Sequence, residues 1–155
     1  AVSEVLIDTL TGENKILRVD ILHDHGRAIN PAIEKGQIEG GYVQGAGWLT
    51  VEEVIWKQNG ELATHSPSTY KIPAVNDMPK KFNVKIFKNL NKENVVNKSK
   101  TTGEPPLMLG MSVFFAIKDA ISSTTKHKII PNLNAPATPE AILLSINDIK
   151  KKYEK

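Results

Sequence analysis

The segment from Pro31 to Trp48 limits the possible folds of this chain most, because it combines a helix start with an unusual run of glycines. Asn30 before Pro31 is typical of an N-cap followed by the first helical position. The helix predicted from there contains five glycines: Gly36, Gly40, Gly41, Gly45 and Gly47. Each glycine costs a helix about 1 kcal/mol relative to alanine. We therefore expect the missing side chains to let another group come close.

The glycines form two stripes, because Gly36 and Gly40 lie one helical turn apart and so do Gly41 and Gly45. A smooth stripe can face the backbone of a neighbouring element, or it can face a bound ligand. The spacing does not choose between these two interpretations.

Alternating apolar residues predict several strands around this helix. They indicate a hairpin with strands at 2–7 and 16–22 and a turn at Thr11-Gly12, a second hairpin with strands at 51–56 and 61–64 about Asn59-Gly60, a strand at 82–87 and a short strand at 95–96. Residues 66–79 hold three prolines and are expected to be an irregular connection.

Two further helices complete the prediction. Residues 107–121 are apolar on nearly all sides, which is typical of a helix buried in the core. Thr138-Pro139-Glu140 predicts the start of an amphipathic last helix that ends in a frayed tail over 150–155. We predict an α+β fold with a mixed or antiparallel sheet, a glycine-rich helix, a buried apolar helix and a C-terminal helix. Residues 1–155 then form a single portion of one domain.

The composition is that of a globular protein, with 40% hydrophobic and 24% charged residues among 155. The net charge of +3 comes mainly from lysines at 88–100 and 150–155, and only Tyr153 adds an aromatic ring to them. A solvated surface explains these lysines better than nucleic-acid binding does. The chain has no cysteine, which excludes disulfides, a cysteine nucleophile and cysteine-ligated metal within it, and fits a cytoplasmic protein.

No apolar run approaches the roughly 20 residues of a membrane span, and no signal peptide is visible, so we expect no membrane segment. The chain starts at Ala1 without methionine and enters a predicted strand at once. We interpret it as a piece of a longer chain.

The sharpest local feature is the run Lys100 to Leu107, which contains Gly103, Glu104 and two prolines. Gly103 permits a backbone turn that other residues resist, and Pro105 is expected to keep Glu104 out of the helical region. A helix N-terminus favours the charged carboxylate, whereas burial favours the acid. Where burial dominates, Glu104 is a competent general base. The alternative is a carboxylate that only caps the following helix.

The four histidines indicate less. His23 and His25 would share one face of a continued strand, a spacing that can bind metal, but no third ligand is evident nearby. We interpret them as turn and surface residues and predict no metal site. His65 and His127 fall in predicted loops.

Four ordered motifs together resemble the xanthine dehydrogenase and aldehyde oxidase family of molybdenum hydroxylases. They are similar to its glycine-rich helix, the segment after that helix, the signature around its catalytic glutamate and the start of its C-terminal helix, and they lie here at 30–45, 67–73, 100–107 and 135–140. The chain departs from the family at Thr101-Thr102, where smaller or apolar residues are common, and at Ala28, where serine is common. Thr102 is the departure that bears on the substrate pocket.

The resemblance implies the C-terminal part of a molybdopterin-binding domain. It implies that Glu104 is the catalytic base, which takes a proton from an oxygen ligand of molybdenum as that oxygen attacks the substrate, while hydride passes to a sulfido group. It also implies that Gln37 lies against the cofactor beside the metal, and we place Gly36 and Gly103 in the same cofactor-binding set. The glycine stripes then have a reason, because a bulky cofactor needs close backbone approach.

The resemblance further implies partners outside this chain: the remainder of the molybdopterin domain, and domains or subunits that carry FAD and 2Fe–2S centres. The substrate implied is a purine, xanthine or hypoxanthine, and the isolated chain is expected to be inactive. Two other hypotheses stay open. The first is a non-catalytic segment of the same fold that serves assembly, and the second is a basic module that binds nucleic acid.

Overall fold

The first two strands form the predicted hairpin. In the computed structural model, which describes residues 1–154, β1 (Val2–Ile7) pairs antiparallel with β2 (Asn14–His23). The turn between them is ordered by the Asp8 carboxylate, which accepts hydrogen bonds from the backbone N–H groups of Leu10 and Thr11. Gly12 has φ +79°, a conformation that favours glycine. A side chain there would also strike the backbone of Pro139, so the turn packs on the start of the last helix.

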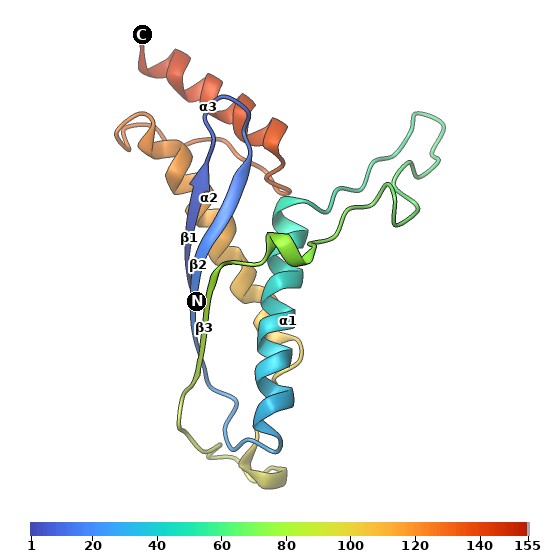
Figure 1. The fold of residues 1–155 in the computed structure, drawn as a ribbon, viewed down its shortest axis with the longest axis vertical. Helices are drawn as coiled ribbons and strands as arrows, with labels where there is room; N and C mark the ends of the chain where they lie inside the picture. Colours follow the sequence, from blue (N-terminus) through green and yellow to red (C-terminus); the bar gives the residue numbers. More distant parts are fainter. Residues whose placement is uncertain (155) are drawn as a thin grey trace.

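The third strand makes the sheet mixed. β3 (Lys81–Ile86) pairs parallel with β2, Arg18 opposite Lys81 and His23 opposite Ile86, so that β2 lies in the centre of the order β1-β2-β3. The predicted strand at 82–87 is confirmed to within a residue, and the α+β class is confirmed as well. Figure 1 shows the helices α1 and α2 running alongside this sheet.

The glycine-rich helix forms as predicted. α1 (Pro31–Thr50) begins at Pro31 because the Asn30 side chain accepts a hydrogen bond from the Ile33 N–H. Its buried face packs into the main core, where Tyr42 meets Phe82 with ring centroids 5.3 Å apart. The Tyr42 hydroxyl is hydrogen-bonded to Ser3 Oγ at 2.8 Å, which joins α1 to β1.

The helix predicted over 107–121 has two parts. A 3₁₀ turn, η3 (Pro105–Gly110), leads into α2 (Met111–Ser123). Val113, Ile117 and Ile121 are fully buried, but Phe115 is 59% exposed, so α2 is buried on one face and not on all sides.

The stretch Pro105–Ser123 is long and apolar enough to cross a membrane by length and composition alone, and a third of it is buried inside the chain. The sequence expectation that no apolar run approaches a membrane span is therefore wrong for this stretch. The core helix of a globular domain meets the same criterion, and the buried face of α2 agrees with that interpretation.

The last helix is confirmed. α3 (Pro139–Tyr153) starts where the Thr138 hydroxyl accepts a hydrogen bond from the Ala141 N–H, and it buries its face through Ile142, Ile146 and Ile149. The tail expected to fray over 150–155 begins inside this helix, and Lys155 lies outside the described residues.

Residues 51–79, which we call the arm, run from the end of α1 away from the body of the molecule and then return to α1 (Figure 1). The predicted turn about Asn59-Gly60 forms, and the Lys57 N–H donates to the Glu61 carbonyl across it at 2.8 Å. The predicted strands at 51–56 and 61–64 are wrong, because their pairing is limited to a single bridge between Trp56 and Leu62, and the rest of the arm forms a short 3₁₀ turn, η1 (Val75–Asp77). The physical reason is the lack of a core beneath them, since Trp56 is 64% exposed. The irregular connection predicted over 66–79 is confirmed apart from η1.

The short strand predicted at 95–96 is also wrong. Val96 begins a 3₁₀ turn, η2 (Val96–Lys98), in which Asn97 and Lys98 both have φ +55°. An extended strand cannot continue through two residues in the left-handed region.

Candidate functional site

The candidate base Glu104 lies at the start of η3. Its backbone angles, φ −86° and ψ −39°, are helical, so the prediction that Pro105 keeps it out of this region is wrong. The local reason is the turn itself, in which the Leu107 N–H donates to the Glu104 carbonyl at 3.0 Å. The carboxylate is exposed and makes no capping hydrogen bond to η3. The capping alternative therefore has no support in this geometry.

Gly103 lies beside Gln37, which comes from a distant part of the sequence. A Cβ built on Gly103 would lie 3.9 Å from Gln37 Oε1 and would meet no other heavy atom within 4 Å. Gly103 does not have a positive φ, so the turn that we expected only glycine to permit is absent. The packing of η3 on α1 thus brings Gln37 and Gly103 to one place. Gly36 precedes Gln37 on α1, and Glu104 follows Gly103 along the chain.

The two glycine stripes of α1 have different surroundings. On the stripe of Gly41 and Gly45, which we call the inner stripe, a Cβ at Gly41 would lie 2.9 Å from Pro106 Cβ, and a Cβ at Gly45 would overlap the carbonyl oxygen of Leu107. Gly110, at the end of η3, packs equally closely against α1, because a Cβ at Gly110 would lie 2.5 Å from the Ala46 nitrogen. The inner stripe therefore allows the backbone of η3 to approach α1 closely. Of the two interpretations given by the sequence, packing against a neighbouring backbone holds for this stripe.

The second stripe, Gly36 and Gly40, faces open space, since a Cβ at either glycine would meet nothing within 4 Å. Packing within residues 1–154 therefore does not explain these two glycines. They cost the helix stability, and a Cβ at either position would gain no contact within residues 1–154. The ligand interpretation stays open for this stripe.

The histidine at position 25 differs from the surface residue that we expected. It is only 2% exposed, and its Nε2 lies 3.3 Å from Glu34 Oε2. Burial and the neighbouring His25 lower the pKa of His23. Within residues 1–154 no group of three or more histidine, cysteine or acidic side chains is placed to hold a metal ion. Sequence reasoning missed the His25–Glu34 contact, because a single loop histidine carries no periodic signal of burial.

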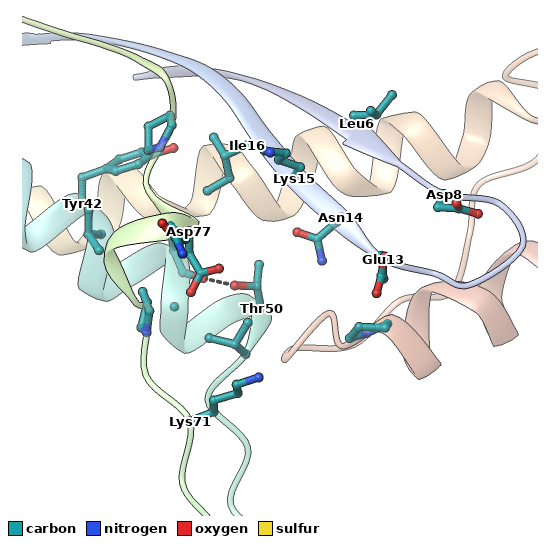
Figure 2. Close-up of a pocket in the computed structure, with 18 residues that line it drawn as sticks. Leu6, Asp8, Glu13, Asn14, Lys15, Ile16, Tyr42, Thr50, Lys71 and Asp77 are labelled. Carbon is teal, nitrogen blue, oxygen red and sulfur yellow. Dashed lines mark hydrogen bonds between the residues drawn. The ribbon is translucent and has the colours of Figure 1, made fainter. Parts of the chain in front are cut away.

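A cavity lies elsewhere on the molecule. It measures about 580 Å³ and is lined by the end of the β1–β2 hairpin, the C-terminal half of α1 and the arm. Figure 2 shows Asn14, Thr50, Lys71 and Asp77 around it. The α1 residue of this cavity that lies nearest to Gln37 in sequence is Tyr42, five positions later. The residues that line the cavity include none of the four site residues Gly36, Gln37, Gly103 and Glu104. The cavity is therefore separate from the candidate site.

Comparison with known proteins decides the family. Residues 1–79, half of the chain, match the family model of the molybdopterin cofactor-binding domain. The chain belongs to this domain family. The xanthine dehydrogenase/oxidase of Felis catus is 49% identical to this molybdopterin-binding segment over 92% of the segment, and a nicotinate hydroxylase of Emericella nidulans is 44% identical over 96%.

Solved structures agree with the family. The crystal structure of quinoline 2-oxidoreductase from Pseudomonas putida 86 covers 93% of the segment with a TM-score of 0.82 and 30% identity, which confirms the fold class. The segment covers 18% of that chain. It covers 11% of the feline relative and 10% of the fungal relative, so it spans about a tenth of the curated relatives that it matches.

Proposed function

We propose that this molybdopterin-binding segment supplies the catalytic base Glu104 to a molybdenum hydroxylase that oxidises a purine, xanthine or hypoxanthine. Gln37, Gly36 and Gly103 are the proposed cofactor contacts. The observation that carries the proposal is the position of Gly103 beside Gln37, because it brings the two motifs together at the start of η3. In a fold where the two lay on opposite sides, the proposal would fail.

The residues fit the cofactor on physical grounds. The open stripe of Gly36 and Gly40 leaves room for a large group against the helix, and the exposed Gln37 amide offers both a donor and an acceptor to its polar edge. Gly103 adds no side chain that would obstruct this approach. When bound, the molybdenum cofactor would supply the oxygen atom and take up two electrons from the substrate.

Glu104 has the proposed role of proton acceptor. Its carboxylate is free of a capping bond to η3, so its oxygens stay available to receive a proton from the oxygen that attacks the substrate. Its exposure in this chain agrees with a position where the remainder of the domain closes over it. Removal of water makes a carboxylate a stronger base, which suits proton abstraction near neutral pH.

The proposed partners follow from the same reasoning. The segment spans about a tenth of the xanthine dehydrogenase/oxidase relative, so the remainder of the molybdopterin domain would complete the site. Electrons would leave through 2Fe–2S and FAD centres on other domains or subunits, since no cysteine is present here. We propose a cytoplasmic enzyme, and we propose that the isolated segment is inactive.

The test is Glu104→Gln in the full-length enzyme, assayed with xanthine and with nicotinate. We expect kcat to fall by about 100-fold to 10,000-fold, because the amide cannot accept the proton. Molybdenum content should remain at the parent level. Glu154→Gln, a matched change at an exposed carboxylate that follows α3, should leave kcat unaltered.

The alternatives predict different results. Normal turnover of the Glu104→Gln enzyme would remove Glu104 from the chemistry and favour an assembly role for this segment. If the parent enzyme preferred nicotinate to xanthine, Glu104 would remain the proposed base, but the proposal of a purine substrate would be rejected. Binding of nucleic acid that weakens steeply with salt would instead support the basic module.

A further inference from the structure

A buried pair of polar side chains lies where the loop after β2 meets the first turn of α1. His25 is 2% exposed and Glu34 is 12% exposed in its side chain, and His25 Nε2 lies 3.3 Å from Glu34 Oε2. The other oxygen of Glu34 accepts a hydrogen bond from the Ile29 N–H at 2.8 Å. Within residues 1–154, the two ring nitrogens of His25 and Glu34 Oε2 have no partner of hydrogen-bond geometry.

The loop that carries His25 is bound on its other side to residues 98–100. The Lys100 N–H donates to the His25 carbonyl at 2.7 Å, and the Arg27 N–H donates to the Lys98 carbonyl at 3.1 Å. Gly26 pairs with Ser99 in a β-bridge. The Asp24 carboxylate also accepts a hydrogen bond from Lys100 Nζ. In Figure 1 this loop, the start of α1 and the segment near residue 100 meet at the lower end of the molecule.

The pair therefore connects the two pieces of chain that carry the proposed site. Glu34 precedes Gln37 by about one turn on α1, and Lys100 precedes Glu104 by four residues. A buried polar group that loses its polar neighbour without gaining water costs free energy, so the protein resists a movement that separates His25 from Glu34. A rotation or slide of the α1 N-terminus relative to residues 98–104 would separate them.

We infer that His25 and Glu34 form a positioning pair, which sets where Gln37 stands relative to Glu104. This inference rests on the proposed function, since it concerns the geometry of that same site. Neither residue touches the reacting atoms in this role. Their effect acts through the placement of the base and the cofactor contact, and displacement of reacting groups by about 1 Å is enough to slow a reaction by 100-fold.

The test is a double-mutant cycle in the full-length, cofactor-loaded enzyme with His25→Gln, Glu34→Gln and the combination of both. Each single change should lower kcat by about 10- to 100-fold with KM near the parent value. The combination should be no worse than either single change, because both remove one interaction. Glu39→Gln is the matched control on the same helix. It breaks an exposed pair with Lys35 at 3.5 Å and should leave kcat as it was.

Two further measurements separate positioning from general destabilisation. Molybdenum content per subunit should equal that of the parent enzyme, and amide hydrogen exchange should speed up at 31–37 and 98–104 but not in α3. Additive losses in the cycle, normal kcat in both single variants, or a loss that follows molybdenum content would overturn the positioning role. Where Glu104→Gln is fully active, it is the proposed function that fails. If Glu104→Gln is inactive but the His25→Gln and Glu34→Gln variants keep the parent kcat, only this inference fails.

Discussion

Replacing Gly45 by alanine tests whether the inner glycine stripe exists for close backbone packing. The new Cβ would overlap the Leu107 carbonyl oxygen and lie 3.0 Å from the carbonyl carbon. Both atoms are backbone, so no side chain can rotate away, and overpacking of this kind costs about 3 kcal/mol. Alanine returns about 1 kcal/mol of helix propensity. The net cost is about 2 kcal/mol, which corresponds to about 30-fold faster local opening.

The matched control is Gly40→Ala, where nothing lies within 4 Å of the new Cβ. There the gain in helix propensity of about 1 kcal/mol stands alone and should slow local opening by about fivefold. Amide hydrogen exchange of peptides at 31–50 and 105–110 in the cofactor-free full-length enzyme measures both effects. Equal or slower exchange in the Gly45→Ala protein would refute the packing role of this stripe.

Two predictions concern pH. Burial raises the pKa of Tyr42 to about 12, so the folded state holds its proton more tightly than the unfolded state does, and stability should fall as the pH rises from 10 towards 12. Thermal unfolding should show less of this alkaline loss in Tyr42→Phe, and an identical loss would contradict the role of the hydroxyl. The Lys100 ammonium and the Asn89 amide hold the pKa of Asp24 well below its usual range, which stabilises the fold above about pH 4 and is lost on acidification. Thermal unfolding of the Asp24→Asn protein should accordingly show a smaller loss of stability as the pH falls below about 4. A loss as large as that of the parent protein would contradict the role of Asp24.

Local signals in the sequence were sufficient for the helix starts and the first hairpin. Asn30-Pro31 and Thr138-Pro139 encode caps within four residues, and the structure forms both. The prediction of strands at 51–56 and 61–64 was wrong because it depends on non-local packing. Alternating apolar residues form a strand where one face is buried, and the arm has no core beneath it. The parallel partner of β2 was equally out of reach, since periodicity does not say which strands pair.

The candidate site was predictable in part. The motifs around Gln37 and Glu104 could be identified by resemblance, but their adjacency depends on how η3 packs against α1. The backbone of Glu104 was mispredicted, because the rule for residues before proline is a bias that a hydrogen-bonded turn can override. The burial of His25 follows from contacts made by three separate segments, and no single window of sequence contains them.

The parallel pairing of β2 with β3 has a consequence for how the arm can vary. Residues 24–80 connect the two strands and must close into a loop before β2 and β3 can pair. This closure costs on the order of 4 kcal/mol of chain entropy. That cost grows only logarithmically, by about 0.6 kcal/mol for each doubling of length. Insertions at the tip of the arm should thus leave the sheet intact, whereas the hairpin of β1 and β2, closed by a few residues, has no such tolerance.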